Sequence, residues 1–101
     1  THDNDTTTGW YQHASEYSRD KVRRYMNTDA SSISWDFIRI CLGSIARYAI
    51  FPVQDLLNLG SEARMNTPGT AEGNWAWRFQ NGALNEGMAQ GLRQMTELFG
   101  R

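Results

Sequence analysis

Residues 60–78 read GSEARMNTPGTAEGNWAWR, a segment whose apolar residues follow neither a helical nor a strand period. Its glycines permit backbone conformations that other residues adopt only with strain, so they indicate a path set by shape: Gly60, Gly69 and Gly73. Trp75 and Trp77 would lie on opposite faces of the segment if it were extended. The segment therefore indicates either a binding loop or a packed Ω-loop whose tryptophans belong to the core.

The first ten residues, THDNDTTTGW, form a second polar motif. His2, Asp3, Asn4 and Asp5 place several hydrogen-bonding groups side by side, and three threonines, a glycine and a tryptophan follow them. At the end of a strand, such a cluster could hold a hydroxyl-rich ligand. A helix-entry turn with an Asx cap explains the same residues equally well.

Length, charge and composition exclude several classes of protein. A chain of 101 residues supports one domain, and a net charge of −1 without a basic stripe argues against a nucleic-acid partner. The longest apolar stretch, residues 48–53, is too short to cross a membrane. Two distant histidines and one cysteine predict no metal site, and Gly9 and Ala14 stand where a calcium loop needs ligands.

Cys41 and Thr1 indicate the redox environment of the chain and whether it is a fragment. Cys41 is the only cysteine, which excludes an internal disulfide and fits a reducing compartment. It follows a helical apolar pattern, so we expect a buried thiol. Because the chain begins with Thr1 and its most polar motif starts at position 2, we expect a fragment or a processed piece of a longer protein.

Helical signals dominate the first half of the chain. Ser15 or Ser18 can cap a helix that ends near Asn27, and a polar connector follows. Ser32 or Ser34 then begins a second helix, with one apolar stripe made by Trp35, Ile38, Leu42, Ile45 and Ala46.

The second half adds a strand, a helical turn and a final helix. The wholly apolar run Ala49–Phe51, which ends at Pro52, is typical of a buried parallel strand. Residues 54–59 predict a helical turn stopped by Gly60. Asn85 caps the last helix, with inward residues Met88, Leu92, Met95 and Phe99, and with Leu84 as a hydrophobic staple. The order of elements is that of a slice of an α/β barrel.

Four stretches resemble the C-terminal end of the 4-α-glucanotransferases, the amylomaltases or disproportionating enzymes of glycoside hydrolase family 77. They are THDNDTTTGW, FPVQDLLNLGSEARMN, PGT and GNWAWR, in the family's order from residue 1 to Arg78. The last helix also fits the family's ending, so the resemblance covers essentially the whole chain.

This resemblance implies an α/β protein with a (β/α)8 barrel, of which residues 1–101 form the C-terminal segment without a second domain. Residues 1–4 would end strand seven and residues 49–53 would be strand eight, so both following loops would reach the catalytic face. A barrel needs about 250 residues. We therefore expect this chain alone to be incomplete, and marginal, molten or aggregating when isolated.

The resemblance also implies a reaction and its residues. The family transfers a segment of a 1,4-α-glucan to the 4-hydroxyl of an acceptor glucose or maltooligosaccharide, by a retaining double displacement without a cofactor. Asp3 matches the family's transition-state stabiliser, and His2, Asn4, Asn66 and Trp75 are the expected substrate-binding residues. The nucleophilic aspartate and the acid/base glutamate would lie upstream of Thr1, in the rest of the barrel, so this chain alone should not catalyse.

Other polar residues have mainly structural interpretations. Gln54 and Asp55 open a helical turn, where an acidic residue is favoured by the helix dipole. Glu62 and Arg64 are expected to form a loop-bracing ion pair or a backbone clamp. Trp75 and Trp77 could stack on glucose rings or anchor the loop.

Two alternative functions remain open. The chain could be a non-catalytic α-glucan-binding module, or a helical interaction domain in which the long loop only packs. The leading hypothesis is a segment of a cytoplasmic 4-α-glucanotransferase, or of a plastid one if the source is a plant.

Overall fold

The computed structural model describes residues 2–101, and helices make up all of its regular secondary structure. The elements are α1 (Thr7–His13), α2 (Glu16–Met26), α3 (Ile33–Leu42), α4 (Val53–Leu56), the 3₁₀ turn η1 (Ser61–Ala63) and α5 (Glu86–Leu98). None of the helices in this described part is long and apolar enough to cross a membrane.

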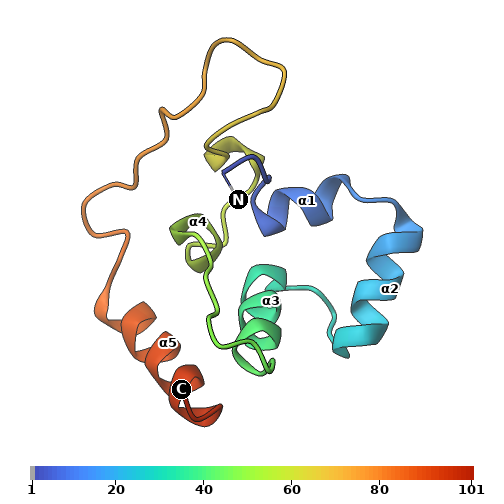
Figure 1. The fold of residues 1–101 in the computed structure, drawn as a ribbon, viewed down its shortest axis with the longest axis vertical. Helices are drawn as coiled ribbons and strands as arrows, with labels where there is room; N and C mark the ends of the chain where they lie inside the picture. The colour runs from blue at the N-terminus through green and yellow to red at the C-terminus, as the bar shows by residue number, and fades with distance from the viewer. Residues whose placement is uncertain (1) are drawn as a thin grey trace.

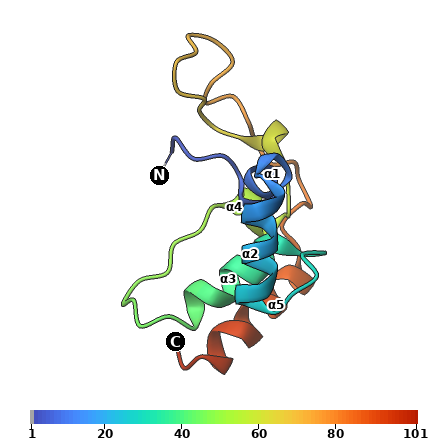
Figure 2. The same ribbon diagram turned by 90° about the vertical axis from the view of Figure 1, so that its right-hand side faces the viewer.

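Helix α3 is the centre of the arrangement (Figure 1). It packs against α1, α4 and α5, and η1 packs against α1. The segment between η1 and α5, gold to orange in Figure 1, runs outside the helices as a wide arc, and the turned view shows the same projection (Figure 2). The radius of gyration is 14.5 Å, larger than the roughly 13 Å of a compact domain of 100 residues.

Local capping explains where three of the helices begin. The Thr6 hydroxyl accepts from the Gly9 N–H at 3.0 Å and caps α1, so the predicted helix entry is confirmed, but its cap is a threonine and not the expected Asx residue. The Ser15 hydroxyl accepts from the Ser18 N–H at 3.2 Å, which confirms one of the two predicted caps. The predicted cap Asn85 accepts from the Met88 N–H at 2.9 Å.

Polar side chains fasten α1, α3 and α4 together. The buried carboxylate of Asp55 accepts from the Thr7 N–H at 2.9 Å and from the Thr7 hydroxyl at 2.8 Å. The Asn58 side-chain oxygen accepts from the hydroxyls of Thr8 and Ser34, at 2.8 and 2.9 Å. Because buried polar groups without partners are costly, these paired groups specify the positions of the three helices.

The apolar core is small. Four hydrophobic residues are buried, and three of them lie on α3: Ile33, Ile38, Leu42 and Ala63. Of the apolar stripe expected for the second helix, Ile45 and Ala46 lie beyond the end of α3 and are exposed. Much of the apolar surface of the chain therefore faces outward.

The two predicted strands are wrong for the residues that the structure describes. Residues 49–52 are irregular, Ile50 is 91% exposed, and Val53 already belongs to α4. Of the other predicted strand, residues 2–4 form a turn, and Thr1 lies outside the described residues. A strand exists only through hydrogen bonds to a neighbouring strand, which residues 2–101 do not supply.

The expected burial of Cys41 is also wrong. The residue lies on α3 as predicted, but its side chain is exposed on the side of the helix that faces residues 50–52. An apolar helical pattern indicates which face can be buried, whereas burial needs another element to cover that face.

Candidate functional site

The first residues and the loop after α4 meet at Asp3, although they are far apart in the sequence. The Asn66 side-chain amide donates to Asp3 Oδ1 at 2.8 Å. The Arg64 guanidinium donates to the main-chain oxygen of Asp3 at 2.7 Å. Beside them, the Ser61 hydroxyl donates to Asp5 Oδ2 at 2.7 Å. Three hydrogen bonds thus join the two polar motifs.

His2 and Trp75 complete this site. His2 Nε2 lies 3.1 Å from Asp3 Oδ1, the same oxygen that accepts from Asn66. The His2 ring is tilted against the indole of Trp75, with 5.2 Å between ring centroids. We call His2, Asp3, Asn66 and Trp75 the Asp3 cluster. It brings together four of the five residues predicted for the site.

Asn4, the fifth predicted residue, lies next to the cluster and is exposed. It lines two neighbouring cavities, one shared with His2 and Arg64 and the other with Asp3 and Arg64. Among residues 2–101 its side chain makes no hydrogen bond to the protein, so its amide is open to solvent.

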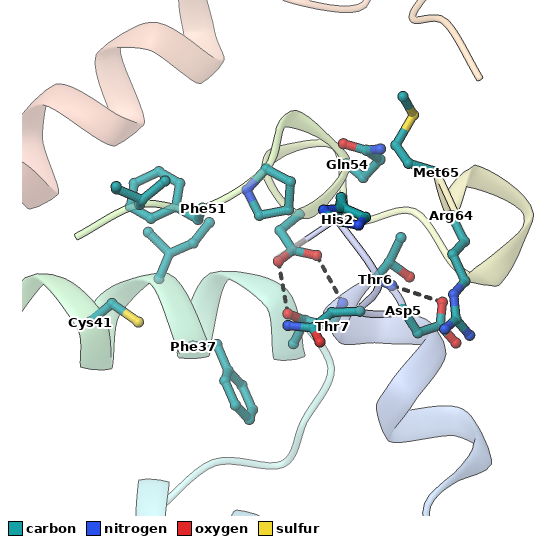
Figure 3. A pocket seen from close by; sticks show the side chains of 15 residues that line it. His2, Asp5, Thr6, Thr7, Phe37, Cys41, Phe51, Gln54, Arg64 and Met65 are labelled. Carbon is teal, nitrogen blue, oxygen red and sulfur yellow. Dashed lines mark hydrogen bonds between the residues drawn. The ribbon is translucent and has the colours of Figure 1, made fainter. Parts of the chain in front are cut away.

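The cavity next to His2 has a volume of about 320 Å³ and combines two kinds of wall (Figure 3). One wall is apolar and includes Phe37, Ile38 and Phe51. The other carries Thr7 and Asp55, whose mutual hydrogen bonds are dashed in Figure 3. The Thr7 and Asp55 groups are thus already paired with one another, whereas the Asn4 amide on the same cavity has no partner among residues 2–101.

Trp75 is positioned by the chain around it. Its N–H donates to the Met65 carbonyl at 2.6 Å, and its backbone has a positive φ of 62°. Of the three glycines that the sequence analysis named in this loop, Gly69 and Gly73 have positive φ values, of 83° and 79°. At Gly60, φ is −82°, and a Cβ there would lie 2.6 Å from the carboxylate of Glu62, whose exposed side chain could move aside.

Asn74 organises the tip of the long loop, and the sequence analysis did not single it out. Its side-chain oxygen accepts from the Thr67 N–H at 2.8 Å, and its amide donates to the Thr70 carbonyl at 3.1 Å. The only sequence signal is the tendency of Asn side chains to bond nearby main chain in turns. These bonds close residues 67–74 into an Ω-like loop that leads back to Trp75.

Four other polar residues make the kind of structural contact that the sequence analysis favoured for them. Gln54 donates to the Ala63 carbonyl at 3.1 Å, and Asp55 bonds Thr7. Of the two options for Glu62 and Arg64, the structure shows backbone clamps: the Glu62 carboxylate accepts from the Gly60 N–H at 3.0 Å, and Arg64 donates to main-chain carbonyls.

The described residues contain no group of three or more His, Cys, Asp or Glu side chains placed to hold a metal ion. The Asp3 cluster instead combines a carboxylate, an imidazole, an amide and an indole. Such a set can hydrogen-bond sugar hydroxyls and stack against the apolar face of a sugar ring.

Comparison with known proteins agrees with these features. Residues 1–85 match the model of a family described as 4-alpha-glucanotransferase. The chain is 50% identical over its full length to a 4-alpha-glucanotransferase of Synechocystis. It is 44% identical over 96% of its length to a 4-alpha-glucanotransferase of Thermus thermophilus. Among solved structures, an amylomaltase from Streptococcus agalactiae in complex with acarbose covers the whole chain, with a TM-score of 0.93 and 29% identity.

The chain corresponds to about a fifth of these proteins. It spans 20% of the Synechocystis protein, 21% of the Thermus protein and 21% of the Streptococcus chain.

Proposed function

Because this chain belongs to the 4-alpha-glucanotransferase family, we propose that it is part of an enzyme that transfers a segment of a 1,4-α-glucan to an acceptor glucan. The observation that carries the proposal is the Asp3 cluster, which joins two family-like motifs through the Asn66–Asp3 hydrogen bond of 2.8 Å. We propose that maltooligosaccharides are donors and acceptors, and that no cofactor takes part.

The reaction is a double displacement with retention at the anomeric carbon. A carboxylate attacks C1 of the donor sugar, the C1–O bond to the leaving sugar breaks, and a carboxylic acid gives its proton to the leaving oxygen. The deprotonated acid then takes the proton of the acceptor's 4-hydroxyl, whose oxygen attacks C1 and releases the first carboxylate. Both carboxyl groups belong to the part of the family's chain that precedes the residues present here.

Asp3 is the group of this chain that acts in that reaction. Its Oδ1 is engaged by Asn66 and lies next to His2, whereas Oδ2 accepts no hydrogen bond from the described residues. Oδ2 accepts from a hydroxyl of the sugar at the cleavage site. This bond strengthens as positive charge develops on the sugar ring, so Asp3 stabilises the transition state more than the ground state.

The other cluster residues hold the substrate. His2 and Asn4 donate to sugar hydroxyls, while the indole of Trp75 presents an apolar face to a glucose ring. The similar Streptococcus amylomaltase is described in complex with acarbose, and we expect acarbose to bind the complete protein and compete with glucans there.

The barrel interpretation is part of the same proposal. The rest of the barrel would cover three surfaces of this chain: the exposed face of α3, the side chain of Ile50 and the 320 Å³ cavity. Residues 49–52 would become a strand once neighbouring strands supply hydrogen-bond partners. We further propose the cytoplasm, or the stroma of a plastid, as the site of action, since relatives include a chloroplastic/amyloplastic protein of Arabidopsis thaliana.

The experiment measures glucose release from maltotriose by the complete protein that carries this chain. We expect release of glucose together with longer maltooligosaccharides, and a loss of about 10²–10³-fold in kcat for Asp3→Asn. Asp20→Asn is the matched control, because Asp20 is a carboxylate on α2 that pairs with Arg24 away from the cluster.

Two results would contradict the proposal. A near-normal rate in Asp3→Asn would remove Asp3 from the reaction. Glucan binding without any glucose release would favour the alternative, a non-catalytic α-glucan-binding module.

A further inference from the structure

Arg64 connects the main chains of the two loops that form the Asp3 cluster. Its Nε donates to the carbonyl oxygen of Asn66 at 2.8 Å, and its Nη2 donates to the carbonyl oxygen of Asp3 at 2.7 Å. One planar group therefore holds the backbones of both residues whose side chains meet at 2.8 Å.

The geometry of a guanidinium explains why arginine suits this position. Its N–H donors lie in one rigid plane, so two bonds from the same group fix both the distance and the relative orientation of their acceptors. A lysine ammonium is a point donor on a flexible stem and cannot hold two carbonyls in a set relationship.

The surroundings of Arg64 exclude an ordinary ion-pair role. Glu62, the nearest acidic residue in sequence, turns back to the Gly60 N–H at 3.0 Å. Among residues 2–101, Arg64 has no salt bridge within 4.0 Å. Within residues 2–101, both hydrogen bonds that Arg64 donates go to main-chain carbonyls, those of Asn66 and Asp3.

From this geometry we infer that Arg64 is a positioning residue for the transferase reaction, one that aims the Asp3 carboxylate at the sugar. This inference rests on the proposed function. Without Arg64, the loop that carries Asn66 would be free to move relative to Asp3, and Asp3 Oδ1 would lose its fixed donor. Displacing a catalytic group by about 1 Å can cost about 10²-fold in rate.

The test compares Arg64→Lys and Arg64→Gln with the wild-type sequence in the complete protein, using maltotriose. We expect kcat to fall by about 10- to 100-fold in Arg64→Gln, with a smaller change in KM, because the lost contact acts on the transition state. Arg64→Lys should recover little of the lost rate, and added guanidinium ion should recover part of it in Arg64→Ala.

A double-mutant cycle separates positioning from general stability. If Arg64 acts through Asn66 and Asp3, Arg64→Gln should reduce kcat much less in an Asn66→Ala background than in the wild type. Fully additive losses in kcat would overturn the inference.

Arg101→Gln is the matched control. Arg101 also clamps main-chain carbonyls, those of Leu42 at 2.7 Å and Ser44 at 3.2 Å, but at the far end of α3. We expect this variant to unfold at lower temperature while keeping its kcat per folded enzyme. An Arg64→Gln enzyme that behaves in the same way would show that Arg64 is only structural.

A crystal structure of Arg64→Gln supplies a readout that does not depend on activity. We expect the Asn66 amide and Asp3 Oδ1 to separate beyond hydrogen-bonding distance, and an unchanged contact would refute the positioning role. If Arg64→Gln does not fold, Arg64→Lys takes its place. A wild-type protein without transferase activity would refute the proposed function, while the crystal structure would still decide what Arg64 holds.

Discussion

The side-chain amide of Asn66 donates a hydrogen bond of 2.8 Å to the carboxylate of Asp3, 63 positions away in the sequence. This contact unites the turn before α1 with the loop after η1. His2 Nε2 lies 3.1 Å from the same carboxylate oxygen, whereas Asp3 Oδ2 accepts no hydrogen bond from residues 2–101. Such an arrangement presents one carboxylate oxygen to a ligand.

Removing the amide should therefore weaken catalysis. A hydrogen bond to a charged group contributes about 1.5–3 kcal/mol, so we expect Asn66→Ala to lower kcat on maltotriose by about 10- to 100-fold. Asn81→Ala, at an exposed position of the loop before α5, is the control. Equal activity of the two variants would show that the amide does not assist Asp3.

Trp75 should affect substrate binding more than the chemical step. An aromatic stacking contact contributes about 0.5–1.5 kcal/mol, so Trp75→Ala should raise the KM for maltotriose by about 2- to 10-fold. Phe79→Ala is the control, because Phe79 and Trp75 are both 51% exposed and lie on the same loop. If Phe79→Ala raises KM as much as Trp75→Ala does, the indole has no specific contact with sugar.

Asp55 should matter for stability. It is buried and accepts two hydrogen bonds from Thr7, so Asp55→Ala leaves a main-chain N–H and a hydroxyl without a partner, at about 1–3 kcal/mol each. We expect a lower urea midpoint for the complete protein, and a smaller loss in Thr7→Val, which removes only the hydroxyl. A midpoint unchanged in Asp55→Ala would mean that α1 and α4 are not held by this contact.

Gly9 allows α1 to approach η1 closely. A Cβ on Gly9 would lie 2.8 Å from the main-chain N of Ser61, which cannot rotate aside, so Gly9→Ala should push these elements apart and destabilise by about 1–3 kcal/mol. Since η1 leads into Arg64 and Asn66, kcat should fall as well.

Gly91→Ala should have the opposite effect on stability. Nothing lies within 4 Å of a Cβ built at Gly91, which is inside α5. Alanine favours a helix over glycine by about 1 kcal/mol, so this variant should be more stable than the wild type. The measurement is the midpoint of thermal unfolding of both glycine variants and of the wild type. A higher midpoint in Gly9→Ala would contradict the close packing of α1 on η1.

Asp29 should make a small, pH-dependent contribution before α3. The Ser31 N–H donates to its carboxylate at 2.9 Å and lowers the pKa of Asp29 below its ordinary value of 3.8. A lowered folded-state pKa means that the stabilisation is present above pH 3.8 and is lost as the pH falls through the folded-state value. We expect the free energy of unfolding to depend less on pH in this range in Asp29→Asn than in the wild type. The same pH dependence in both proteins would contradict the contact.

Several features could be predicted because they depend on neighbours in the sequence. Ser15 and Asn85 begin their helices as expected, since a cap bonds an N–H only three residues away. The family resemblance carried by the four stretches is confirmed by the family match over residues 1–85. The same resemblance named His2, Asp3, Asn4, Asn66 and Trp75, and the structure brings the side chains of all but Asn4 into contact.

Other features depend on contacts that no local pattern contains. The apolar run at residues 49–51 predicted a strand, and the apolar period around Cys41 predicted a buried thiol. Both predictions are wrong for this structure because a strand needs a paired neighbour and a buried face needs a cover, and residues 2–101 provide neither there. The role of Asn74 in closing the loop was also missed.

The sequence by itself thus determined the starts of α2 and α5, the family and the identity of the polar residues, because these follow from local hydrogen bonding and from motif content. Only the tertiary structure decided that Arg64 clamps Asp3 and Asn66 from the main-chain side. It also decided that Asp55 and Asn58 join α1, α3 and α4. The contacts of Arg64 with Asp3 and of Asp55 and Asn58 with α1 and α3 join residues that are far apart in the sequence. Their geometry depends on how the helices pack, which no local sequence pattern specifies.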